Sequence, residues 1–289
     1  MPEWVIVILL GVIEGVTEFL PVSSTGHLLL AEHWLPRQSD LFTSDLFNTV
    51  IQCGAVLALF GVFTDRIKQL IFRWKESATQ DYFSKLAVAF IITGIGGVIL
   101  KKLDFELPEK VAPVASATLI GGVLFLVVEY WLRQRPLSGE VTWKIAIAAG
   151  LSQLVAAVFP GTSRSGVTIL AALLLGLNRP AAAEFSFLLG IPTLLAAGAL
   201  QTVSALKQPG GETVPWSMIL LGSATAAVTA FVVVKWLLRF VQTHTFVGFA
   251  WYRIALGILL LAFVQEESTK LPLADPTRPI PSISAQTNR

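Results

Sequence analysis

The chain has 289 residues, of which 54% are hydrophobic and only 14% are charged, and its mean hydropathy is +0.70. A soluble domain carries about 25% charged residues, so this composition excludes an ordinary water-soluble globular protein. The net charge of +2 is far from the strongly basic balance of nucleic-acid-binding proteins. Cys53 is the sole cysteine, which excludes an intrachain disulfide or a cysteine-based metal site.

The first apolar run, from Trp4 to Leu20, ends at Pro21 and is followed by the polar stretch Ser23-Ser-Thr-Gly-His27. The next apolar piece, Leu28 to about Leu35, is too short to cross a bilayer, which takes about 20 helical residues. We therefore expect a broken helix that returns the chain to the side it entered from. Full transmembrane helices are expected at about 47–63, 86–100 and 111–131.

The same order of elements then recurs. The run from Trp143 to Phe159 ends at Pro160, and the polar stretch to Gly166 is followed by a short apolar piece to Leu177. Three more spans are expected at about 181–203, 216–238 and 246–264. Residues 265–289 hold four prolines and many polar side chains, and we expect this tail to be disordered.

The recurrence indicates an internal duplication. A constant offset of 139 (150 minus 11) aligns four pairs: Gly11 with Gly150, Glu14 with Gln153, Pro21 with Pro160, and Ser24 with Ser163. Three spans after one re-entrant hairpin leave the second hairpin on the opposite face. We predict an all-α integral membrane protein with an inverted-topology repeat. Residues 1–264 would form one membrane domain, with repeat one at about 1–132 and repeat two at about 140–264.

Both polar breaks are expected to face one pocket, because irregular backbone at membrane depth has to be buried in protein or line a wet cavity. The loops on one side are richer in lysine and arginine, among them Arg66, Lys68 and Arg73. The positive-inside rule places that side in the cytoplasm of the cell. The first hairpin would then open to the outside.

Glu14 and Glu18 lie four residues apart and share one face of the first half-helix. A charge inside a membrane helix costs about 2.5–3.5 kcal/mol, and a neighbouring like charge adds to that cost. Such a pair is tolerated where it binds a divalent cation, shares a proton or faces an arginine. Because carboxylate oxygens suit Mg²⁺ or Ca²⁺, we predict Glu14 and Glu18 as metal ligands. The alternative is that both lie in water at the helix edge.

Ser24, Thr25 and His27 follow the first break. A hydroxyl near an imidazole is the minimal pairing for an activated nucleophile or a proton shuttle. The start of the second half-helix also offers free N–H groups to an anion. The alternatives are helix capping for the hydroxyls and a structural hydrogen bond for His27.

Arg164, in Pro160-Gly-Thr-Ser-Arg-Ser-Gly166, is the most informative residue of the second break. Arginine is always charged, and its planar fork binds phosphate at two points. Ser163 and Ser165 can cap the following half-helix or donate to phosphate oxygens. The alternative is that Arg164 pairs structurally with Glu14 or Glu18. Together the two breaks predict a site for phosphoryl transfer, in which stabilising negative charge is most of the task.

The sequence resembles the bacterial undecaprenyl-diphosphate phosphatases that give resistance to bacitracin. The resemblance rests on Glu14-Gly-Val-Thr-Glu-Phe-Leu-Pro-Val-Ser-Ser-Thr-Gly-His27 and on 160–166, with further similar segments at 47–55, 183–192 and 251–257. It implies hydrolysis of undecaprenyl diphosphate to the monophosphate, a divalent-metal requirement, and a pocket open to the periplasm of a bacterial plasma membrane. It also implies functional roles for Glu14, Glu18, Ser24, Thr25, His27, Ser163 and Arg164, with Ser165 as an addition.

We expect Arg164 and a cation on Glu14 and Glu18 to hold the diphosphate, while Ser24 attacks and His27 handles the proton. His27 as the nucleophile, or as the base that activates water, fits the same residues.

A polyprenyl-phosphate flippase or anion transporter is the main alternative function, because inverted repeats with broken helices are common in transporters. Another class of membrane lipid phosphatases needs a second histidine soon after a Ser-Arg pair, and none occurs between His33 and His244. The partners expected are the lipid substrate and the bilayer, with no nucleic acid. A homodimer is left open, because no stripe of small residues stands out as a dimer face.

Overall fold

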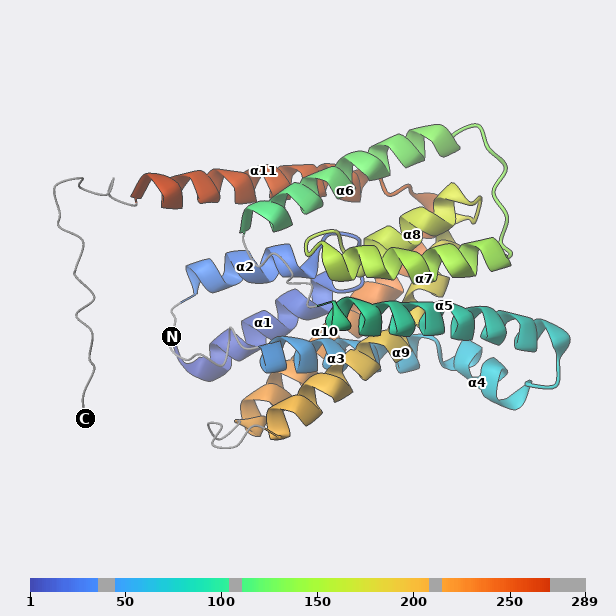
Figure 1. Ribbon diagram of the computed structural model, residues 1–289, viewed down its shortest axis with the longest axis horizontal. Helices are drawn as coiled ribbons and strands as arrows, with labels where there is room; N and C mark the ends of the chain where they lie inside the picture. Colours follow the sequence, from blue (N-terminus) through green and yellow to red (C-terminus); the bar gives the residue numbers. More distant parts are fainter. Residues whose placement is uncertain (36–44, 104–110, 208–214, 271–289) are drawn as a thin grey trace.

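The computed structural model describes residues 1–35, 45–103, 111–207 and 215–270, and apart from one isolated β-bridge its regular structure there is helical (Figure 1). The helices are α1 (Glu3–Thr17), α2 (Ser24–Trp34), α3 (Asp45–Val62), α4 (Thr64–Phe72), α5 (Ser77–Lys102), α6 (Val111–Leu132), α7 (Trp143–Val158), α8 (Arg164–Leu174), α9 (Arg179–Leu206), α10 (Trp216–Thr243) and α11 (Val247–Lys270).

Four helices of the described chain, α5, α6, α9 and α10, are long and apolar enough to cross a membrane. The bent pair of α3 and α4 adds a fifth span if the two count as one, and α11 contributes a shorter apolar stretch, Val247–Ala262. Large apolar side chains such as Ile95, Leu220 and Val228 are more than half exposed on the long helices. Such extensive exposed apolar surface is unfavourable in water, so the protein is an all-helical, multi-pass membrane protein.

Several features of the helices differ from the sequence prediction. Helix α4, which follows a 75° bend after α3, is not among the predicted elements. Helix α5 begins at Ser77, before the predicted start at Leu86, because a helix can continue into polar residues beyond the apolar part of a span. Lys85 pairs with Asp81 one turn earlier in this extension.

Helix α11 continues to Lys270, whereas the sequence predicts a disordered tail from residue 265. The residues from Gln265 to Lys270 include neither glycine nor proline, and nothing there breaks a helix. The predicted disorder of 271–289 lies outside the described residues.

The predicted breaks are present, and each separates two short helices. In Figure 1 the outer ends of α1 and α2 lie at the left of the bundle, the outer ends of α7 and α8 lie at the right, and both turns lie near the middle. Helix α1 packs against α10, and α7 packs against α5. Glycines allow this close approach. A Cβ atom on Gly11 of α1 would lie 2.6 Å from the carbonyl oxygen of Gly222, and one on Gly150 of α7 would lie 2.7 Å from the carbonyl oxygen of Ala89.

The ends of α6, α9 and α11 are joined by a buried carboxylate. Glu129 is 2% exposed and accepts hydrogen bonds from the Arg179 guanidinium and, at 2.9 Å, from the backbone N–H of Phe246. Removing one partner of a buried ion pair leaves the other charge without compensation.

We therefore expect Glu129→Gln to destabilise the protein by about 3 kcal/mol and to lower its Tm in detergent. The matched control is Glu76→Gln, because the Arg73–Glu76 pair has side chains that are 63% and 43% exposed. Exposed pairs contribute about 0–1 kcal/mol, so this control should melt close to wild type. Equal Tm values for the two variants would contradict the proposed role of Glu129.

Candidate functional site

The two breaks have the same local structure. Ser23 and Ser163 cap the starts of α2 and α8 with positive φ angles of 75° and 67°, a region that residues other than glycine seldom adopt. Each side-chain oxygen accepts a hydrogen bond from the backbone N–H three residues later, at 3.3 Å from Gly26 and at 3.2 Å from Gly166.

These caps correct the register predicted for the repeat. The constant offset of 139 matches Ser24 with Ser163, but the residue with the capping geometry is Ser23. Two residues separate Pro160 from Ser163, whereas only Val22 separates Pro21 from Ser23. Gly161, with a φ of 96°, lies in the longer turn. Ser24 therefore corresponds to Arg164, and Thr25 corresponds to Ser165.

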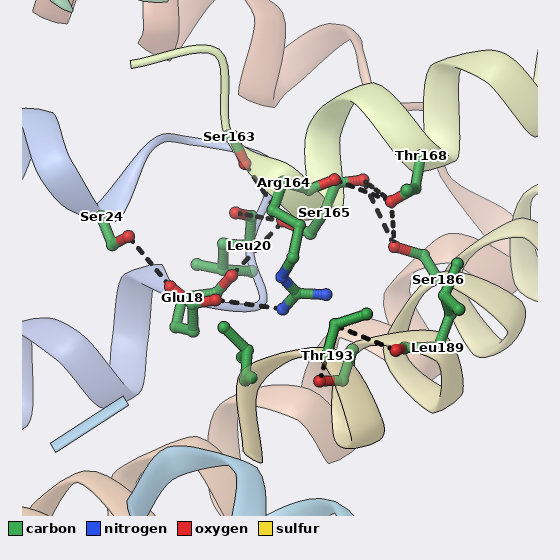
Figure 2. A network of polar contacts seen from close by, with 12 residues as sticks. Glu18, Leu20, Ser24, Ser163, Arg164, Ser165, Thr168, Ser186, Leu189 and Thr193 are labelled. Atoms are coloured by element: carbon green, nitrogen blue, oxygen red, sulfur yellow. Dashed lines mark hydrogen bonds and ion pairs between the residues drawn. The ribbon is translucent and has the colours of Figure 1, made fainter. Parts of the chain in front are cut away.

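An ion pair joins the two breaks (Figure 2). Glu18 follows the last residue of α1, and its Oε1 accepts a hydrogen bond from Arg164 Nη2 at 3.0 Å. The side chains are only 6% and 13% exposed. The other oxygen, Oε2, accepts from Ser24 Oγ, also at 3.0 Å. Residues far apart in the sequence thus form one polar network inside the bundle.

Arg164 has donors left over. Its Nε and Nη1 are buried and have no hydrogen-bond partner among the described residues. The Phe19 ring lies 5.8 Å from the guanidinium carbon. A Cβ atom on Gly190 of α9 would collide with the guanidinium, so this glycine gives Arg164 its room. Buried guanidinium N–H groups of this kind are suited to a bound anion.

Glu14 lies one turn before Glu18, with which it interacts electrostatically, as it does with Arg164. It is fully buried, and neither carboxylate oxygen has a hydrogen-bond partner in the described chain. Two ionised carboxylates cannot hydrogen-bond to each other. Arg164 compensates one of the two charges, so the other calls for a cation or a proton.

The donor set fits a hard divalent cation only in part. No group of three or more His, Cys, Asp or Glu side chains is placed to hold a metal within the described ranges. Glu14 and Glu18 alone leave most of a coordination shell to other ligands. That arrangement suits Mg²⁺, which is often held by one or two carboxylates together with water and substrate phosphate.

The serines of the second break are hydrogen-bonded within the protein. Ser165 is buried, and its hydroxyl lies 3.2 Å from the carbonyl oxygen of Leu20 and 3.1 Å from Ser163 Oγ (Figure 2). These contacts tie the start of α8 to the turn after α1. The geometry therefore gives Ser165 a positioning contact, whereas the sequence predicts a binding role.

His27 is not hydrogen-bonded to Ser24 among the described residues. Its Nδ1 lies 2.7 Å from the carbonyl oxygen of Ser23, so this nitrogen carries the proton. In the neutral ring, Nε2 then accepts from the hydroxyl of Tyr252 at 2.6 Å. Thr25 is exposed and joins none of the hydrogen bonds found in this network.

Sequence reasoning missed Arg253, which lies in α11 behind both breaks and is fully buried. Its guanidinium donates to five backbone carbonyl groups, including Pro21 at 3.1 Å in the first turn and Gly161 and Thr162 at 3.1 and 3.0 Å in the second. The sequence could have indicated it, because a lone charged arginine inside an apolar run is costly and needs hydrogen-bond acceptors within the protein.

These features define a class of protein: a multi-pass helical membrane protein whose two broken helices meet at a buried ion pair with guanidinium donors to spare. The chain belongs to the family described as bacitracin resistance protein BacA, whose model matches residues 7–259.

Curated relatives cover nearly the whole chain. A protein of Rhizobium etli named undecaprenyl-diphosphatase is 48% identical over 254 residues, which is 88% of this chain and 94% of the relative. Proteins of the same name from Xanthomonas euvesicatoria and Xylella fastidiosa are each 48% identical, over 91% and 89% of this chain and 98% and 97% of their own length.

The contacts of Arg253 predict that its displacement weakens anion binding. A Cβ atom on Gly121 would overlap the guanidinium, so Gly121→Ala should move Arg253 and loosen both turns while every charge is kept. We expect inorganic diphosphate to bind this variant at least about tenfold more weakly than wild type by isothermal titration calorimetry, because small misplacements cost much at such sites.

Gly97→Ala is the matched control, since a Cβ atom there meets nothing within 4 Å. Arg253→Lys keeps the positive charge but loses the forked guanidinium group, and it should bind inorganic diphosphate as weakly as Gly121→Ala. Wild-type affinity in both the Gly121 and the Arg253 variants would show that Arg253 does not position the turns.

Proposed function

We propose that this protein hydrolyses undecaprenyl diphosphate to undecaprenyl phosphate and inorganic phosphate, which recycles the lipid carrier for peptidoglycan synthesis. The observation that carries the proposal is the buried Glu18–Arg164 pair, which leaves Arg164 Nε and Nη1 free to bind an anion. The family and the printed names of the relatives support the same lipid.

The terminal phosphate would bind between the starts of α2 and α8. Helix N-termini carry free N–H groups and the positive end of the helix dipole, which favour an anion. Arg164 lies at the start of α8 and donates to two phosphate oxygens in this proposal. Ser24, at the start of α2, is held beside the same phosphate by its hydrogen bond to Glu18.

Ser24 is the nucleophile in this proposal, and Glu18 takes its proton. The Oγ of Ser24 attacks the terminal phosphorus, and the bond from that phosphorus to the bridging oxygen breaks. Undecaprenyl phosphate leaves with the bridging oxygen, and water then hydrolyses the phosphoserine to release phosphate. His27 makes no hydrogen bond to Ser24 in the described structure, so Glu18 replaces it as the nearest base.

We further propose that Glu14 and Glu18 hold a divalent cation, Mg²⁺ or Ca²⁺. The two buried oxygens of Glu14 without partners support this assignment. Such a cation supplies positive charge against the phosphate oxygens when bound. The remaining ligands would be water and the substrate.

The inverted repeat is also proposed, with the boundaries predicted from the sequence. Support comes from the equivalent caps at Ser23 and Ser163 and from the matching packing of α1 on α10 and α7 on α5. The positive-inside rule would place the first hairpin, and with it the mouth of the site, on the periplasmic side of the bacterial inner membrane. A homodimer is not required, because both breaks come from one chain.

A flippase or anion transporter remains the second candidate, favoured by broken helices that meet in the middle of the bundle (Figure 1). Phosphate release in detergent, where there is no second compartment, distinguishes the two functions, because pure protein releases phosphate there only if it is a phosphatase.

The test is phosphate release from undecaprenyl diphosphate by detergent-purified protein. We expect activity in wild type and a loss of at least about 100-fold in Arg164→Ala, Glu18→Ala and Ser24→Ala, as is common for groups that stabilise or attack the transition state. Removal of divalent cations with EDTA should abolish the activity, and Mg²⁺ or Ca²⁺ should restore it.

Gly94→Ala is a suitable control, since a Cβ atom there meets nothing within 4 Å. Ser24→Ala with wild-type turnover would eliminate the serine nucleophile and favour His27 or water. No phosphate release from well-folded wild type would eliminate the phosphatase and favour transport.

A further inference from the structure

An apolar cavity of about 410 Å³ lies beside the first break, outside the polar network of Glu18 and Arg164. The end of α1 and the turn after it form one wall, and the C-terminal part of α10 and the start of α11 form the other. This volume is within the range of about 300–1,000 Å³ that is usual for small-molecule sites.

The second wall is a cluster of aromatic rings that brace one another. The Trp236 and Phe240 rings stack with centroids 5.2 Å apart, and Phe249 packs edge-on against both, at 6.3 and 5.7 Å. Trp236 is half exposed, so the cavity reaches the lipid-facing surface of the bundle. Rings packed in this way form a rigid surface for an apolar ligand.

The cavity adjoins the first break at His27. The His27 ring lines the cavity, bonds to the backbone of Ser23 next to Ser24, and stacks on Tyr252 with centroids 5.6 Å apart. The Tyr252 hydroxyl, also in the lining, is already bonded to His27. The third polar side chain of the lining, Thr17, donates to the carbonyl oxygen of Ile13. Polar groups that are already paired leave the cavity suited to an apolar occupant.

We propose that this cavity holds the isoprene units next to the diphosphate of the lipid substrate. The inference rests on the proposed function, because a diphosphate bound at Arg164 and Ser24 places the start of its tail beside His27. Isoprene units present flat double bonds and methyl branches, which pack well on aromatic faces. His27 therefore separates the polar end of the site from the apolar end.

The cavity would act on substrate selection more than on overall affinity. A tail that leaves lipid for the cavity gains no hydrophobic free energy, because both surroundings are apolar. The gain is packing against a rigid wall and alignment of the diphosphate with Ser24. Blocking the cavity should therefore penalise substrates whose tail is long enough to fill it.

Gly248 of α11 offers a position from which a larger side chain can fill the cavity. It lines the cavity, and a Cβ atom on it would meet nothing within 4 Å. The experiment compares Gly248→Phe with Gly97→Phe, since Gly97 has equally open surroundings and lies on α5 outside the cavity. Phosphate release is measured with farnesyl diphosphate, whose tail fills the cavity, and with dimethylallyl diphosphate, whose tail is one isoprene unit.

We expect the ratio of kcat/KM for farnesyl to dimethylallyl diphosphate to fall at least fivefold in Gly248→Phe and to stay at the wild-type value in Gly97→Phe. Gly248→Leu, a smaller filler, should give an intermediate ratio and serves if the phenylalanine variant folds poorly. An unchanged ratio in both Gly248 variants would overturn the proposal, whether neither substrate loses activity or both lose it equally.

A second readout does not depend on turnover. A farnesyl diphosphate analogue that carries a photoreactive diazirine on its tail should crosslink in wild type to residues that line the cavity, on α10, α11 and the end of α1, and less in Gly248→Phe. Labelling confined to residues outside this lining would contradict the cavity assignment. Wild type that labels as expected but releases no phosphate would refute the proposed function and leave the lipid-binding cavity in place.

Discussion

The buried ion pair between Glu18 and Arg164 is the interaction on which the rest of the site depends. Each charge alone would be costly inside a membrane bundle, and attraction between them offsets that cost only when their geometry is good. The pair therefore requires the end of α1 and the start of α8 to lie together. It also uses only one of the guanidinium nitrogens, so Arg164 keeps the donors that an anion needs.

Other buried polar contacts also hold the end of α1 and the start of α8 together. Ser165 ties α8 to the turn after α1, and Arg253 holds the carbonyl groups of both turns from behind. Carbonyl groups released by the helix breaks would otherwise lack partners at a depth where lipid cannot provide them. Irregular backbone is thus stabilised where the chemistry is proposed, and the apolar face of the same break is left to line the cavity beside His27.

Much of this arrangement could be predicted from the sequence. Pro21 and Pro160 mark the breaks, the four-residue spacing places Glu14 and Glu18 on one face, and Arg164 has to be paired because it lies among apolar runs. The structure confirms the two breaks, and it shows Arg164 paired with Glu18, which the sequence offered as the alternative to a phosphate-binding role. Composition and hydropathy were sufficient for these features because each follows from the cost of polar groups in lipid.

The remaining features depend on packing that no local pattern encodes. The side chain of His27 turns toward Tyr252 because α11 presents that hydroxyl, a contact between residues 225 positions apart. The one-residue shift of the caps follows from the longer turn after Pro160, which a gap-free alignment hides. The 75° bend between α3 and α4 lies at the end of an apolar run and no proline marks it, so hydropathy did not reveal it.

The central claim is that Glu18 and Arg164 act as one unit within a single site. A double-mutant cycle on single-turnover phosphate release tests it most directly, with Glu18→Gln, Arg164→Gln and the double variant measured with radiolabelled undecaprenyl diphosphate. The account predicts strong coupling, with the double variant scarcely slower than either single variant and an interaction energy of at least about 2 kcal/mol. Losses that simply add would show that the two residues act independently and would contradict the account.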